Sequence, residues 1–444
     1  MGDYPRSTIP DVALVRRHFS SHHLEDVAGE VRRQLHQTDL PGRVKAGQRI
    51  AITAGSRGVA NIALILRVIV DELKKLDARP FIVPAMGSHG GATAQGQVDL
   101  IAEYGITQES MGVPILSSME TVVLGRTPQG ATVHMDRNAY NADGVIVVNR
   151  VKNHTSFRAS IESGLCKMMA IGLGKQLGAE SIHDHGLALN IPEAARVIMG
   201  TGKIVLGVAT VENGYHDVSK IVVAPPERIH DTDRELLELS SRLLPRVPFD
   251  ELDVLVVDWM GKNISGGGMD SNVIGMWRGN DESTSLPLYR RVVVLNVTPE
   301  SHGNCVGIGA AEFTTRKLME QFDAAKTYWN ALTANDPSAA RIPISLDTDV
   351  EAVEVALRSA KPQGGDFRMV RIKSTLDLRD LYVTLPLLNQ LQDNPEFEVL
   401  RGPGPMPRDE RGNLLWDATA SFPWDRPTAS QARWTRAPGA RRRS

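Results

Sequence analysis

Two glycine-rich turns each carry a side chain that can bind an anion or move a proton. The turn Gly55–Gly58 includes Arg57, whose guanidinium can hold a carboxylate or phosphate through two parallel hydrogen bonds. The turn Gly87–Gly91 includes His89, whose imidazole exchanges a proton near neutral pH. Together they suit an anionic small molecule that undergoes proton transfer. Neither turn has the spacing of a phosphate-binding or dinucleotide motif, and a plain connection between a strand and a helix is the alternative.

A denser group of reactive side chains follows further along the chain. His154 stands in a basic segment directly after an apolar run. Cys166 is either a small core residue or a reactive thiol, and Lys167 is either an attachment point for a ligand or an ordinary exposed lysine. His183 and His185 are two residues apart and could bind a metal, although the sequence shows no third ligand beside them. A structural loop histidine is the alternative at His154.

The elements around these residues predict a parallel α/β sheet. Short β-rich runs alternate with apolar residues at helical spacing. In such sheets ligands bind beyond the carboxyl ends of the strands, where both glycine turns would lie. The expected strands cover residues 50–53, 81–85, 145–149 and 204–209, and the expected helices cover residues 62–75 and 98–104.

The second half repeats the pattern and predicts a second α/β domain. Strands are expected over residues 254–258 and 292–296, and helices over residues 314–332 and 350–360. From about Pro403 the chain is rich in Pro, Gly and Arg, which is typical of a solvated terminus. We therefore predict an N-terminal domain over residues 1–250, a C-terminal domain over residues 251–402 and a terminal segment over residues 403–444.

Composition excludes several classes of protein. Lys and Arg number 50 against 52 Asp and Glu, a net charge of −2, so nothing draws the whole chain to nucleic acid or an anionic membrane. The longest apolar stretches fall far short of the roughly 20 residues of a membrane helix, and no apolar signal segment is visible, which favours a cytoplasmic location. Two cysteines, Cys166 and Cys305, can form neither a disulfide framework nor a four-cysteine zinc site. The segment Gly172–Lys175 superficially looks like a phosphate-binding loop but lacks its frame.

Taken together, these residues resemble the nickel-dependent lactate racemase family of 2-hydroxyacid racemases and epimerases. The resemblance rests on the order of Arg57, His89, His154, Lys167 and His183, in which His183 comes sixteen positions after Lys167. It implies a two-domain α/β fold with mainly parallel sheets and an active-site cleft between the domains. It also implies a nickel-pincer nucleotide (pyridinium-3,5-bisthiocarboxylic acid mononucleotide nickel). In this family a lysine can be joined covalently to the cofactor, and Lys167 stands at that position. The expected reaction is racemisation or epimerisation of a 2-hydroxy acid by reversible hydride transfer to that nucleotide.

The second half adds to this resemblance. Residues Gly266–Asn272 look like the family segment that ends in substrate-binding side chains, and Arg278 stands where a lysine is usual. The resemblance then implies a role for each candidate. The catalytic residues would be His89 and His154; the substrate-binding residues Arg57, Arg278 and Lys262; the cofactor-binding residues Lys167, Gly55, Ser56, Gly90, Asp270 and Asn272; and the nickel ligand His183.

Departures from the family pattern concern the substrate side. Ala54 replaces the aspartate that commonly precedes the arginine of the first turn, and the spacing from His154 to the lysine is three residues longer. Ile274 and Gly275 stand where a tyrosine and a glutamine are expected. We therefore expect a substrate other than lactate. The partners implied are a 2-hydroxy acid and the enzymes that synthesise the cofactor.

Two other functions remain open from the sequence. One is a zinc-dependent hydrolase or lyase that uses His183, Asp184 and His185. The other is a non-catalytic protein that binds a small molecule or nucleotide on the same scaffold. Visible absorption by a pyridinium group and the metal content would distinguish the first alternative, and loss of activity in His89 and His154 variants would distinguish the second.

Overall fold

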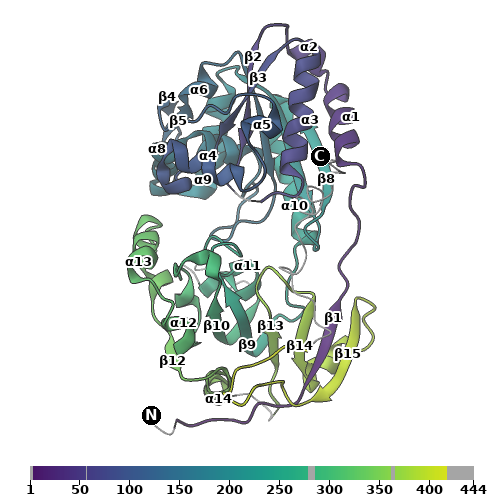
Figure 1. The fold of residues 1–444 in the computed structure, drawn as a ribbon, viewed down its shortest axis with the longest axis vertical. Coiled ribbons are helices and arrows are strands. Elements are labelled where there is room, and N and C mark those ends of the chain that lie inside the picture. Colours follow the sequence, from purple (N-terminus) through teal and green to yellow (C-terminus); the bar gives the residue numbers. More distant parts are fainter. Residues whose placement is uncertain (1–3, 57, 279–285, 362–365, 418–444) are drawn as a thin grey trace, which may run out of the picture. The chain divides into compact units, whose positions relative to one another are not determined.

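The computed structural model describes residues 4–56, 58–278, 286–361 and 366–417. These residues form two compact units (Figure 1). Among the described residues, unit 1 contains residues 4–19 and those from 245 to 417, and unit 2 contains those from 20 to 244. Both units combine helices with mainly parallel sheets, which confirms the predicted α/β class.

A five-stranded sheet in the order β3-β2-β6-β7-β8 forms the centre of unit 2 within the described residues. The first four strands are parallel, and β8 is antiparallel to β7. The apolar runs read from the sequence become strands that are buried on both faces, as expected of a covered parallel sheet. The strands are β2 (Arg49–Ala54), β3 (Arg79–Pro84), β6 (Gly144–Arg150), β7 (Ile204–Glu212) and β8 (Val218–Ala224).

Helices cover both faces of this sheet. Ile50 and Ile52 pack with the helices α1 and α3 on one face, while Ala51 packs with α9 and α10 on the other. The helices are α1 (Val27–Gln37), α2 (Leu40–Arg43), α3 (Ile62–Lys75), α4 (Ala94–Ala102), α5 (Gln108–Met111), α6 (Arg137–Tyr140), α7 (Leu165–Lys167), α8 (Lys175–Asp184), α9 (Leu187–Met199) and α10 (Ile229–Leu243). A small antiparallel pair, β4 (Thr121–Arg126) and β5 (Thr132–Asp136), completes the unit.

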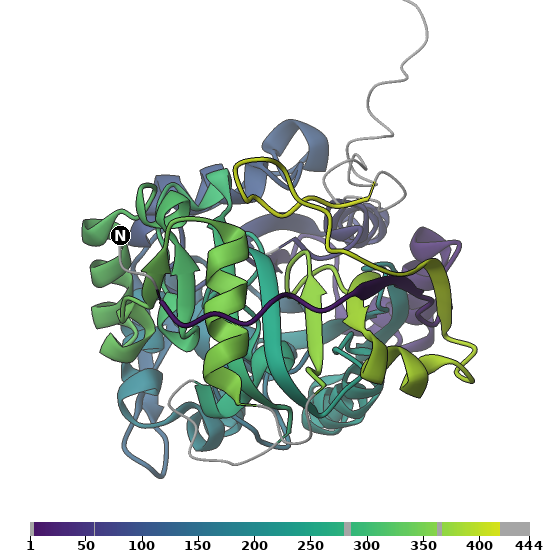
Figure 2. The same cartoon turned by 90° about the horizontal axis from the view of Figure 1, so that it is seen from below.

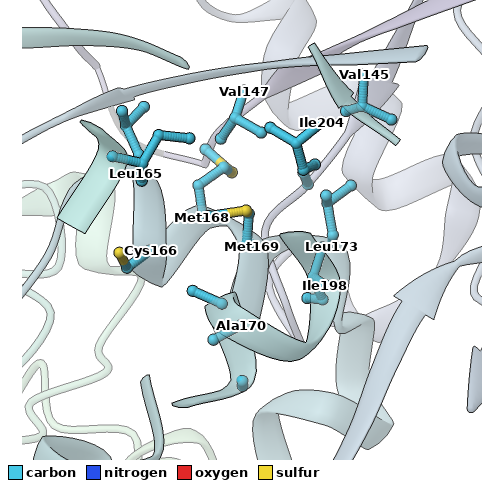
Figure 3. Packing of buried hydrophobic residues seen from close by; sticks show 14 of the residues in the cluster. Val145, Val147, Leu165, Cys166, Met168, Met169, Ala170, Leu173, Ile198 and Ile204 are labelled. Atoms are coloured by element: carbon cyan, nitrogen blue, oxygen red, sulfur yellow. The ribbon is translucent and has the colours of Figure 1, made fainter. Parts of the chain in front are cut away.

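A π-helical turn, η2 (Met168–Leu173), connects α7 to α8. Its apolar side chains enter the core that β6 and β7 cover, where Met169 and Leu173 lie near Val147 and Ile204 (Figure 3). In a π turn the backbone hydrogen bonds span five residues instead of the four of an α-helix, so the helix is wider there. Such turns are frequently found at functional sites. This turn therefore fixes the segment between Lys167 and His183 to the core of unit 2 through its buried side chains.

Unit 1 is built on an eight-stranded sheet in the order β12-β11-β10-β9-β13-β14-β1-β15 within the described residues. The strands from β12 to β13 are parallel, and β14, β1 and β15 are antiparallel to their neighbours. The strands are β1 (Val12–Arg17), β9 (Glu251–Met260), β10 (Leu288–Val297), β11 (Phe313–Thr315), β12 (Ile344–Leu346), β13 (Met369–Ile372), β14 (Asp380–Thr384) and β15 (Phe397–Gly404).

The start of the chain thus lies in the same unit as its later half. Strand β1 pairs with β14 and β15, and the backbone N–H of Ser7 donates to Glu354 O on α14 (3.1 Å). Figure 2 shows α14 (Asp349–Ala360) on one face of the sheet with the N-terminal segment passing over it. The contacts therefore group the first 19 residues differently from the predicted range 1–250.

Two expectations for unit 1 change in detail. The expected helix over residues 314–332 is broken into β11, α12 (Arg316–Met319) and α13 (Ala324–Thr333), because the hydroxyls of Thr314 and Thr315 donate to β10 carbonyls. Residues 403–417, predicted as solvated, pack on the sheet through the buried side chains of Met406 and Leu414. The remaining helices are α11 (Ser271–Ile274) and α15 (Leu385–Leu391). Among the described helices, none combines the length and apolar character needed to cross a membrane.

Candidate active site

Three predicted site segments follow neighbouring parallel strands of unit 2. Gly55 and Ser56 follow β2, the His89 turn follows β3, and His154 follows β6. Because these strands are parallel and adjacent, their carboxyl ends meet at one edge of the sheet. The fold therefore places these segments on the edge where ligands bind in such sheets.

The His89 turn is held by its glycines and by one glutamine. Gly90 has a φ of 67°, and a Cβ added there would lie 2.5 Å from the Gly96 backbone, so only glycine fits. The Gln97 side-chain amide donates to Gly87 O (2.8 Å) and to His89 O (3.3 Å). His89 itself is exposed, so its imidazole can reach a ligand from a fixed backbone.

His154 lies in a loop that fixes its tautomer. Its Nδ1 accepts a hydrogen bond from the Ser156 backbone N–H (3.1 Å), and its own backbone N–H donates to the buried Glu162 carboxylate (2.8 Å). The Phe157 ring lies 4.5 Å from the imidazole, centroid to centroid. Because Nδ1 accepts, the neutral ring carries its proton on Nε2. His154 is therefore prepared to donate a proton or hydrogen bond from Nε2.

Lys167 and His183 lie at the two ends of the segment that runs through η2. Lys167 is half-buried at the end of α7, and His183 is exposed in the last turn of α8. The surrounding protein atoms displace water from His183, and this is the largest effect that lowers its pKa. The Lys167 ammonium lowers the pKa further, and the Asp184 carboxylate raises it by a smaller amount. The imidazole of His183 is thus kept neutral, which is the form that binds a transition metal.

The same segment packs directly against both glycine turns. A Cβ added at Gly55 would lie 3.1 Å from Met168 Cε, and one added at Gly87 would lie 3.2 Å from Ile171 Cγ2. The Gly87 N–H also donates to Gly172 O (3.3 Å). The structure therefore brings the two turns into contact with the residues between Lys167 and His183.

The first turn is described only in part. Gly55 and Ser56 are half-buried, and the Tyr104 hydroxyl donates to Ser56 O (3.1 Å). Arg57 lies outside the described residues. The backbone of this turn is thus anchored to Tyr104, two residues after the end of α4, while the role of Arg57 stays a prediction.

The predicted residues of the second half belong to unit 1. The Lys262 ammonium donates to Gly266 O (2.6 Å) and to Asn330 Oδ1 (2.7 Å). Asp270 caps α11, and its Oδ1 accepts from the backbone and side chain of Asn272 (2.9 and 2.7 Å). Both Asp270 and Asn272 are buried, so they stabilise the turn that follows the glycine run.

Arg278 is occupied by contacts within the protein. Its side chain is 3 % exposed, and Nη1 donates to Glu312 Oε1 (2.7 Å) and Ala310 O (2.9 Å). Nη2 donates to Tyr289 O. These contacts favour a structural role for Arg278 over the substrate-binding role expected from the sequence.

Metal-binding capacity is limited to isolated side chains. Among the described residues, no three His, Cys, Asp or Glu side chains lie close enough to hold a metal ion. His185, next to His183, uses Nδ1 to contact Ser181 O (2.8 Å).

Sequence reasoning missed the buried polar residues that hold these segments. Asp233 on α10 accepts from the Leu165 and Cys166 N–H groups (2.9 and 2.8 Å), directly before Lys167. Lys175 and Asp136 form a fully buried ion pair below the His89 turn. Lys175 can be noticed in the sequence because it follows two glycines, Gly172 and Gly174. Its partner Asp136 lies on a strand distant in the sequence and belongs to no motif.

The fold and site define an α/β protein with histidines and a lysine at the carboxyl edge of a parallel sheet. Residues 8–194 match the model of the lactate racemase N-terminal domain. This match supports a function of the racemase or epimerase type.

A solved structure shows the same fold over most of the chain. The lactate racemase apoprotein from Thermoanaerobacterium thermosaccharolyticum matches with a TM-score of 0.51 and 13% sequence identity, over 85% of this chain and 95% of that one. At this identity the likeness supports the fold alone. No curated protein sequence matches the chain.

Proposed function

We propose that the protein is a racemase or epimerase of a 2-hydroxy acid that works with a nickel-pincer nucleotide. The observation that carries the proposal is the packing of the segment from Lys167 to His183 against both glycine turns at one sheet edge. The match to the lactate racemase N-terminal domain and the lowered pKa of His183 support it.

The donor set of the chain fits such a cofactor. His183 offers one neutral imidazole for nickel, and Lys167 offers an amine for attachment of the nucleotide. Gly55, Ser56 and Gly90 would offer backbone atoms to the nucleotide, because the two glycines carry no side chain of their own. When bound, the nucleotide supplies reversible acceptance of the substrate's α-hydrogen as hydride.

The chain's own residues then bind the substrate and move its hydroxyl proton. His89 and His154 act as general base and general acid, and each such group contributes about 10²–10⁴-fold in rate. His154 starts as a donor from Nε2, because Ser156 occupies Nδ1. Arg57 would hold the carboxylate, whereas the Lys262 ammonium donates to Gly266 O and Asn330 Oδ1 within unit 1. Arg278, Asp270 and Asn272 would act indirectly, by shaping their part of unit 1.

Nickel retention tests the proposal most directly. Protein co-expressed with the cofactor-synthesis enzymes should contain nickel and show the mass of the nucleotide. The His183→Ala variant should lose nickel, because its imidazole would be the protein's ligand. His185→Ala is the matched control, since it removes an exposed imidazole two residues away and should retain nickel.

Two results would contradict the proposal. Equal nickel content in the His183→Ala variant and the wild type would remove His183 from the site. Stoichiometric zinc without a nucleotide would favour the hydrolase alternative. With nickel and nucleotide present, loss of optical activity across a panel of 2-hydroxy acids would identify the substrate.

A further inference from the structure

Lys175 is a fully buried lysine at the start of α8, the helix that carries His183. Its φ of 54° is rare for a residue with a side chain, and its ammonium points into the interior. There it donates to Pro84 O, the last carbonyl of β3, and to Gln97 Oε1 (2.9 Å). Asp136 Oδ2, at the end of β5, lies 3.3 Å from the same ammonium.

Gln97 extends these contacts to the His89 turn. Its carbonyl oxygen accepts from Lys175, while its amide nitrogen donates to Gly87 O (2.8 Å) and His89 O (3.3 Å). Gln97 is itself buried on α4. A continuous set of hydrogen bonds thus runs from the first residue of α8 to the backbone of His89.

This arrangement is costly if it serves stability alone. Burial raises the pKa of Asp136 and lowers the pKa of Lys175, because it disfavours the charged form of each group. The opposite charge of the partner offsets part of this cost. Replacing a buried ion pair by apolar side chains is often neutral or stabilising. An apolar pair would not provide the hydrogen bonds that the Lys175 ammonium donates to Pro84 O and Gln97 Oε1.

We propose that Lys175, Asp136 and Gln97 form a positioning network that fixes the His89 turn relative to the helix that carries His183. Lys175 orients Gln97, and Gln97 sets the two carbonyls of the turn. The catalytic meaning of this placement depends on the proposed function, whereas the physical coupling between the turn and α8 does not.

A double variant separates positioning from charge balance. Lys175→Met alone leaves the Asp136 carboxylate buried without its partner and should destabilise unit 2. Combining Lys175→Met with Asp136→Asn removes both charges and should restore the melting temperature close to that of the wild type. The contacts to Pro84 and Gln97 stay absent in the double variant, so amides of residues 85–93 should exchange hydrogen at least about tenfold faster.

A second variant needs no change at the ion pair. Gln97→Glu keeps an acceptor for Lys175 but removes the N–H groups that donate to Gly87 O and His89 O. Exchange should rise in residues 85–93. Gln95→Glu is the matched control, because Gln95 is exposed on the same helix and its side-chain amide donates to Asp99. It should leave exchange in the turn unchanged.

Hydrogen exchange on the full chain, without and with the cofactor, decides the proposal. Faster exchange in residues 85–93 of the double and Gln97→Glu variants, with kcat lowered at least about tenfold and KM little changed, would support it. Wild-type exchange in that segment for both variants would overturn it. If the loaded wild type racemises no 2-hydroxy acid, the proposed function fails, and the exchange data still judge the network.

Discussion

Asp233 is a buried carboxylate whose ionisation opposes its environment. Burial raises its pKa to about 6, although the N–H groups of Leu165 and Cys166 partly stabilise the charged form. Its side chain connects α10 to the short helix that ends at Lys167. The protonation state of Asp233 therefore affects both the stability of unit 2 and the base of the candidate attachment site.

We expect Asp233 to make the free energy of unfolding fall as pH rises. The folded-state pKa lies above the ordinary value of 3.8, so the folded protein binds the extra proton between about pH 4 and pH 6. The stabilisation is complete below pH 4 and is lost as pH rises through 6. Urea unfolding at several pH values should show the difference between wild type and Asp233→Asn decreasing over this window.

A neighbouring residue provides the control for this measurement. Asp231→Asn changes a solvent-accessible carboxylate on the same helix, which pairs with Arg228 and Arg234. This variant shows how the pH profile responds to the loss of another carboxylate on α10. A flat difference between wild type and Asp233→Asn would show that Asp233 ionises normally in the folded protein.

At the scale of elements, sequence patterns identified the strands and helices around the site well. Apolar runs gave β2, β3, β6 and β7, and helical spacing gave α3 with its observed bounds. The π turn was not predictable, because its apolar residues would fit an ordinary helix equally well. Its geometry depends on close packing of Gly172 against Ala85 and Met168, which no local pattern records.

We expect Gly172→Ala to damage this packing. A Cβ there would lie 2.6 Å from Met168 Sδ and 2.8 Å from Ala85 O, and the backbone oxygen cannot move away easily. Overpacking of this kind typically costs about 1–3 kcal/mol. Thermal unfolding should show the loss. The Lys167 to His183 segment should also bind less nickel if the proposed function holds.

Gly58→Ala is a suitable comparison, because its new Cβ would make an ordinary contact of 3.4 Å with Tyr104. It should change the melting temperature little. Equal stability of Gly172→Ala and the wild type would mean that the π turn can relax around an added methyl group. The turn would then be less rigid than its burial suggests.

At the scale of the whole molecule, long-range pairing was the part that the sequence could not supply. Local patterns predicted two α/β domains, but β1 pairs with strands more than 360 residues away, Val12 opposite Thr384 and Leu14 opposite Tyr382. The six residues of β1 are only apolar and basic, and this local pattern does not specify which strands they pair with. Arg278 shows the same limit at the site, since its partner Glu312 is reached only through the fold.

We expect Leu14→Ala to weaken unit 1 and leave unit 2 intact. Leu14 is fully buried in the core beneath α14, and truncation of such a leucine costs about 2–5 kcal/mol. Because the two units have separate cores, hydrogen exchange should accelerate in residues 245–417 and stay unchanged in residues 20–244. Val399→Ala, at an exposed position of β15, should alter neither unit measurably. Acceleration in both units after Leu14→Ala would show that the chain unfolds as one cooperative body, in which the N-terminal strand supports the candidate site as well.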